Sequence, residues 1–168
     1  MRKITTFLIC FLFCSAFLFS QNKKNISKNI EKWINENFSG DRTPFNNGKY
    51  VFVAFTSINN GVLKQKNYKK VFDTKYAFMN DNSKMTLNLK DLYYDSVTYT
   101  LDEGQYFIYA KCKNNVFCSK SVNEKGEVNG SETPLLGMIE KNKTDINKCI
   151  EAFTKVIKIY SNNKQFNW

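Results

Sequence analysis

The feature that most constrains this chain is a change in the period of its apolar residues. Between residues 49 and 139 apolar and polar residues alternate, and residues 84–90 show this best, with Met85, Leu87 and Leu89 predicted to point inward. Before and after this region apolar residues recur every three or four positions, the period of an amphipathic helix. The pattern therefore predicts an α+β domain: antiparallel strands in two packed or partly closed sheets, with a helix at each end.

The helices are predicted at residues 26–38 and 143–161, each with one apolar stripe. In the first helix, Glu31 and its charged neighbours are placed on the polar face. In the second, Asn142 or Thr144 is a candidate N-cap, and Asp145 is placed in the positive first turn. The two apolar stripes are predicted to pack on the sheets.

The first strands are predicted around a tight turn. Residues 50–58 are apolar on both faces, which predicts an internal strand, and Asn59-Asn60-Gly61 supplies the positive-φ residues of a hairpin. The lysine-rich strand at 62–72 is predicted at a sheet edge, where charged side chains discourage aggregation. The preceding segment through Pro44 and Gly48 is predicted as a loop.

The later strands are less regular. A short strand is predicted at residues 76–79, and the turn at 102–104 ends a further alternating run. Residues 105–113 and 116–122 are predicted to pair as a hairpin. A polar loop at 123–134 then leads to a last strand at 135–139.

The N-terminus predicts export. Arg2 and Lys3 precede an apolar run that ends near Ser20, which is the pattern of a secretory signal peptide over residues 1–20. The run is short for a spanning helix, so cleavage is favoured over a retained anchor, leaving no transmembrane segment and a secreted or periplasmic product. Residues 21–168 are then one domain with its core at about 26–161.

Several segments resemble one protein family. Residues 85–92 (Met-Thr-Leu-Asn-Leu-Lys-Asp-Leu), the Cys112…Cys118 segment and the helix at 149–157 resemble small exported pleckstrin-homology-like (PH-like) proteins of Bacteroidetes. The Phe-rich leader is similar to export signals of the same bacteria. The resemblance implies a PH-like sandwich or partly open barrel of about seven strands, capped by the C-terminal helix, with an additional N-terminal helix. It implies no particular activity.

The chain contains no histidine. Nucleophile–histidine pairs and most zinc sites are therefore excluded, and the carboxylates fall in or near turns, where Asp is ordinary turn chemistry. No catalytic, cofactor-binding or metal-binding residue is predicted. The expected function is a non-enzymatic binding or structural module of the bacterial envelope. The alternatives are a secreted hydrolase using paired carboxylates and a secreted effector or inhibitor.

Three cysteines lie outside the leader. If Asn114 to Val116 form a turn, Cys112 lies opposite Cys118, near enough for a disulfide, and an oxidising compartment favours the bond. Cys149 is then left over on the apolar helix face. A bridge from either cysteine to Cys149, or free thiols, are the alternatives.

The net charge of +10 falls to +8 when Arg2 and Lys3 leave with the signal. Arg42 is then the only arginine, which argues against nucleic acid, because phosphate and base recognition usually draw on arginine. An envelope protein or an anionic glycan or lipid surface is the expected partner. The candidate contacts lie on the lysine-rich strand: Lys64, Lys66, Lys69 and Lys70.

Two further kinds of site are considered. Asp95-Ser96-Val97 resembles the acceptor sequence of Bacteroidetes protein O-glycosylation, with Ser96 as the acceptor. Sugars stack on exposed aromatic rings, and Tyr68, Tyr94 and Tyr106 are candidates for such a platform. Core or cross-strand packing is the commoner role of aromatic residues in a small β-rich domain.

Overall fold

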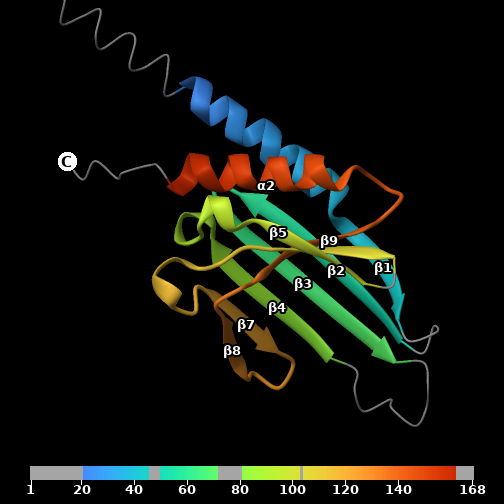
Figure 1. The fold of residues 1–168 in the computed structure, drawn as a ribbon. Coiled ribbons are helices and arrows are strands. Elements are labelled where there is room, and N and C mark those ends of the chain that lie inside the picture. The colour runs from blue at the N-terminus through green and yellow to red at the C-terminus, as the bar shows by residue number, and fades with distance from the viewer. Residues whose placement is uncertain (1–20, 46–49, 72–80, 103, 162–168) are drawn as a thin grey trace, which may run out of the picture.

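The computed structural model describes residues 21–45, 50–71, 81–102 and 104–161. These residues form two antiparallel sheets and two helices (Figure 1). The larger sheet has six strands in the order β1-β2-β3-β4-β7-β8, and the smaller has three in the order β5-β6-β9. The α+β class and the antiparallel pairing are confirmed. The described strands number nine rather than about seven, and they include no closed barrel.

The strands of the larger sheet are β1 (Ser39–Phe45), β2 (Tyr50–Asn59), β3 (Val62–Val71), β4 (Asp81–Asn88), β7 (Ser119–Asn123) and β8 (Val128–Ser131). Those of the smaller sheet are β5 (Thr98–Asp102), β6 (Gln105–Tyr109) and β9 (Leu135–Glu140). Short 3₁₀ turns are η2 (Leu89–Asp91), η3 (Tyr94–Ser96) and η4 (Lys113–Asn115). The N-terminal helix covers residues 21–37, and α2 covers Ile146–Ser161.

The two helices pack against each other at one end of the long strands (Figure 1). The Phe38 ring, just after the N-terminal helix, meets the Phe153 ring of α2 edge to face at 5.2 Å. Earlier in the same helix, Glu31 accepts a hydrogen bond from the Tyr160 hydroxyl at 2.8 Å. Phe38 therefore lies opposite Phe153, and Glu31 lies opposite Tyr160. Because the numbers rise in one helix as they fall in the other, the two helices are antiparallel.

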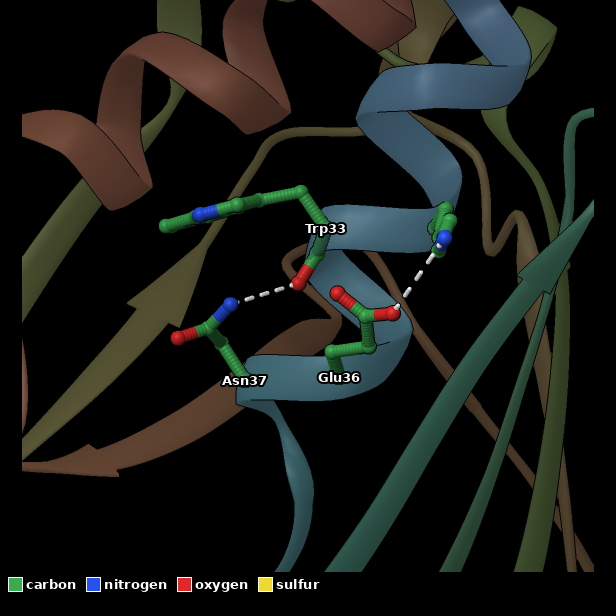
Figure 2. A network of polar contacts seen from close by, with 4 residues as sticks. Trp33, Glu36 and Asn37 are labelled. Carbon is green, nitrogen blue, oxygen red and sulfur yellow. Dashed lines mark hydrogen bonds and ion pairs between the residues drawn. The ribbon is translucent and has the colours of Figure 1, made fainter.

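The ends of the helices are stabilised by local contacts. Asn37 donates from its side-chain amide to the carbonyl oxygen of Trp33 at 2.8 Å in the last turn of the N-terminal helix (Figure 2). At the start of α2, Asp145 accepts from the backbone N–H of Asn147 at 2.9 Å. The cap of α2 is therefore Asp145 itself, not Asn142 or Thr144.

One core joins both helices to both sheets. Its members include Ile58, Leu63 and Leu87 from the larger sheet and Ile108 and Leu136 from the smaller one. From α2 come the buried residues Cys149, Phe153, Val156 and Ile157. The predicted apolar stripe of the last helix therefore does face the sheets, as its spacing indicated.

The β2–β3 hairpin forms as predicted. Asn60 and Gly61 have φ angles of 50° and 74°, which is the left-handed conformation that a two-residue turn of this kind requires. Strand β2 lies between β1 and β3, so its internal position is confirmed. Its outward face is not buried, however, because Phe55 is 44% exposed.

Strand β3 was predicted at an edge and lies in the interior of the sheet, between β2 and β4. Its Lys64 and Lys66 are exposed because they point to the solvent side, whereas Leu63 and Gln65 between them are buried. The lysines therefore mark an open face of the sheet rather than its edge.

The predicted hairpin of residues 105–122 is wrong. Strand β6 pairs with β5 and β9 in the smaller sheet, and β7 pairs with β4 and β8 in the larger one. The chain therefore crosses between sheets at η4. Strands β1 and β8 occupy segments that were predicted as loops. The strand predicted at 76–79 lies outside the described residues.

Candidate ligand-binding face

The outward-facing side chains of β2, β3, β4 and β7 form a surface that we call the open face. Strand register sets them in rows across the sheet, and one row runs Phe55, Lys66, Lys84, Val122. The next row runs Ser57, Lys64, Thr86, Lys120. Alternation along each strand produces this arrangement, since the residues between them point into the core.

Four exposed lysines lie in these two neighbouring rows: Lys64, Lys66, Lys84 and Lys120. Lys66 and Lys84 are directly paired across strands, and like charges in that position repel each other. Within the part of the chain that the structure describes, none of these lysines forms an ion pair. The open face thus carries a concentrated positive charge.

Two grooves cross the open face and share Lys66 and Tyr68. The first, of about 500 Å³, is lined by Asn35, Phe55, Thr56, Ser57, Lys64, Lys66 and Tyr68. The second, of about 380 Å³, is lined by Lys66, Tyr68, Asn82, Ser83, Lys84, Val122, Asn123 and Glu124. Because both are lined by Lys66 and Tyr68, the two grooves lie next to each other on the open face.

Tyr68 is the aromatic candidate that the structure places on this face. It is 40% exposed, and its ring meets that of Phe55 edge to face at 5.9 Å. The other two candidates lie elsewhere. Tyr94 lies beneath the ammonium group of Lys158, 5.2 Å from its ring centroid, and Tyr106 packs edge to face with Tyr99 at 5.2 Å.

The structure describes the side chains of two of the four lysines that the sequence named as candidate contacts. Lys64 and Lys66 lie on the open face and line the grooves. Lys69 and Lys70 belong to the far end of β3, and their side chains lie outside the described residues. Lys84 and Lys120 were not singled out from the sequence. Lys84 could have been found from the alternation of residues 84–90, but Lys120 joins the cluster only because β7 pairs with β4.

The disulfide between Cys112 and Cys118 is present, with a Cα–Cα distance of 5.6 Å. The reason given for it was wrong, because the two cysteines do not face each other in a hairpin. They bridge the turn at η4, where the chain passes from the smaller sheet to the larger. Cys149 is free and buried. Burial, and secondarily the negative charge of Asp145, raises the pKa of its thiol to about 11.

Ser96 takes part in two hydrogen bonds. Its hydroxyl donates to the carbonyl oxygen of Tyr93 at 2.7 Å and accepts from the backbone N–H of Lys111 at 2.8 Å. These bonds tie η3 to the chain after β6. Glycosylation of Ser96 remains a prediction. The sugar would be attached to a hydroxyl oxygen that already forms hydrogen bonds with two segments of the chain.

A buried carboxylate was missed by the sequence reasoning. Glu31 is only 5% exposed and accepts from the backbone N–H of Gly61 at 2.9 Å, as well as from Tyr160. Its neighbour Asn35 donates to the carbonyl oxygen of Ile58 at 3.0 Å and accepts from the Ile58 N–H at 2.7 Å. These side chains attach the N-terminal helix to the β2–β3 hairpin, next to the first groove.

The described residues contain no cluster of three or more potential metal-ligating Cys, Asp or Glu residues. No helix in the described part of the chain has both the length and the apolar character needed to span a bilayer.

Comparison with known protein families, with characterised proteins and with solved structures finds no match to this chain. The open face therefore has to be interpreted from its own chemistry.

Proposed function

We propose that this protein is an exported, non-enzymatic binding module of the bacterial envelope, and that its open face binds an anionic partner. The observation that carries the proposal is the cluster of four exposed lysines on the open face, three of which line the grooves and none of which forms an ion pair among the described residues. Lys66 and Lys84 repel each other in the free protein, so an anion between them would relieve that repulsion. Long-range attraction would also speed the encounter with an anionic surface.

Export is supported by the signal-like leader and by the disulfide, since such bonds persist in oxidising compartments. A paired-carboxylate hydrolase has less support at the open face, because the described lining of the two grooves contains a single carboxylate, that of Glu124. The likeness to PH-like proteins is part of the proposal. Two antiparallel sheets followed by an amphipathic helix support it, and a structure of such a protein with the same strand order would test it.

The proposal can be tested with purified envelope fragments. We expect the protein to sediment with them at about 0.01 M salt and to be released toward about 1 M salt, where the Debye length shrinks from about 30 Å to about 3 Å. The double variant Lys66→Gln/Lys84→Gln should lose this binding. The matched control Lys141→Gln/Lys148→Gln removes the same charge from exposed positions outside the grooves. Equal binding by the two double variants would contradict the proposal.

A further inference from the structure

The non-charged residues of the open face narrow the kind of anion that it fits. Beside the lysines, the grooves are lined mostly by hydroxyl and amide side chains: Asn35, Thr56, Ser57, Asn82, Ser83 and Asn123. Asn35 and Thr56 already form hydrogen bonds within the protein, with Ile58 and Gln65. The hydroxyls of Ser57 and Ser83 can exchange hydrogen bonds with ligand hydroxyls. Phe55, Tyr68 and Val122 add apolar surface to the same lining.

An aromatic platform lies where the two grooves meet. Tyr68 lines both of them and remains 40% exposed, although Phe55 packs against its ring. The edge-to-face contact with Phe55 orients this ring, so little conformational freedom would be lost on binding. Lys66, which also lines both grooves, places a positive charge beside the platform.

Together the two adjacent grooves would fit an extended ligand. Their linings span β2, β3, β4 and β7, a width of about 14 Å if neighbouring strands lie about 4.8 Å apart. The grooves have volumes of about 500 and 380 Å³, which fall within the usual range of small-ligand sites. Lys64 and Lys66 on β3 and Lys84 on β4 line the grooves, and Lys120 lies beyond them on β7.

We propose that the ligand of the open face is an acidic polysaccharide chain, with one sugar ring stacked on Tyr68 and neighbouring acidic groups bound by Lys64, Lys66 and Lys84. This inference rests on the proposed function and names its ligand class. The combination of hydroxyl groups, an oriented aromatic ring and clustered lysines matches a ligand that carries ring faces, hydroxyls and negative charges.

The test is calorimetric titration of the whole protein, expressed with its leader and recovered from a bacterial periplasm. The probes are alginate oligosaccharides (a polyuronate), neutral dextran oligosaccharides, poly-glutamate and vesicles of phosphatidylglycerol with phosphatidylcholine. We expect binding to alginate, with poly-glutamate and the vesicles at least about tenfold weaker and dextran weaker still.

Three variants separate charge from stacking. Lys66→Gln/Lys84→Gln should weaken alginate binding about tenfold, and the matched Lys141→Gln/Lys148→Gln variant should not. Tyr68→Leu keeps apolar bulk against Phe55 but removes the ring, and it should weaken alginate binding about three- to tenfold. Tyr68→Phe keeps the ring and should bind like the wild type. Each variant is first compared with the wild type by thermal melting.

The outcomes distinguish the two proposals. If poly-glutamate binds as tightly as alginate, or if Tyr68→Leu leaves alginate binding unchanged while the Lys66/Lys84 variant loses it, the polysaccharide inference is overturned and the anionic binding face stands. Preferential binding to the vesicles would replace the polysaccharide with a lipid surface. If the Lys66/Lys84 variant and its matched control bind every polyanion equally, the proposed function itself fails.

Discussion

The carboxylate of Glu31 connects three parts of the chain. It accepts hydrogen bonds from the Gly61 N–H in the β2–β3 turn and from the Tyr160 hydroxyl of α2, and it belongs to the N-terminal helix itself. In sequence it looks like one more charged residue on a polar helix face. Its burial follows from the position of the hairpin turn, which local periodicity does not reveal.

We expect Glu31→Ala to lower the free energy of unfolding by about 2–3 kcal/mol, because it leaves two poorly hydrated donors without an acceptor. Glu36→Ala is the matched control on the same helix, where the carboxylate is exposed and 3.9 Å from the Lys32 ammonium (Figure 2). That change should alter stability by less than about 0.5 kcal/mol. Urea unfolding of the two variants measures both values, and equal losses would show that the Glu31 contacts contribute nothing specific.

The Cys149 thiol should make stability depend on alkaline pH. Its pKa is raised by burial from 9.0 to about 11, so the folded protein holds the proton more tightly than the unfolded chain. Its contribution is complete below about pH 9 and is lost as the pH rises toward 11, by about 3 kcal/mol in total. Burial also raises the pKa of Tyr160, which acts in the same direction, so wild type must be compared with a variant.

Cys149→Ala provides that comparison. It removes the thiol and keeps Tyr160 and the lysines, so the difference between the two unfolding curves isolates Cys149. We expect the unfolding free energy of the variant to fall less steeply between pH 9 and 11, whatever its starting value at neutral pH. Parallel pH profiles would mean that Cys149 titrates alike in both states.

Elements were predictable from the sequence where the signal is local. Both helices, the β2–β3 turn and the inward residues of β4 follow from periodicity and from positive-φ residues. Strand partners are not local. Residues 105–109 and 119–123 both alternate and flank Asn114 and Asn115, yet the strands that they form lie in different sheets.

The open face, too, was predictable from the sequence only where its residues lie on the same strand. Alternation alone places Lys64, Lys66 and Tyr68 on one face of β3, because they are two residues apart. The lysines of β3 suggested an edge position, because strands rich in charged residues are common at sheet edges. An interior strand with one solvent-exposed face has the same alternation of lysines and apolar residues. Lys120 joins the open face only through the pairing of β7 with β4, which the sequence did not indicate.

The disulfide should stabilise the crossover between the sheets. Cys112 and Cys118 are separated by six positions, and closing so short a loop is expected to contribute about 2 kcal/mol. Cys112→Ser/Cys118→Ser should therefore unfold at lower urea concentration than the wild type. Dithiothreitol should lower the stability of the wild type and of Cys149→Ala, and leave the double variant unchanged. A wild type that is insensitive to full reduction of the bond would contradict this expectation.

At the scale of the whole molecule, α2 closes the core that both sheets share. Its four fully buried residues belong to one cluster with Leu87 of the larger sheet and Ile108 of the smaller. The N-terminal helix joins the same cluster through Ile34, and Phe38 just beyond it packs on Phe153. The two sheets and two helices should therefore unfold together, with coincident transitions in tryptophan fluorescence and far-ultraviolet circular dichroism.

Deletion of residues 143–168 tests whether the two sheets depend on α2 for their stability. The four buried residues of α2 each contribute about 1.5–3 kcal/mol of apolar burial, and together this rivals the 5–15 kcal/mol that typically separates folded from unfolded domains. We expect the truncated chain to show no cooperative melting transition. Lys148→Ala on the exposed face of the same helix is the control and should melt like the wild type. A truncated protein that melted with the wild-type midpoint would mean that the sheets form a core without α2, and that the shared cluster does not hold the molecule together.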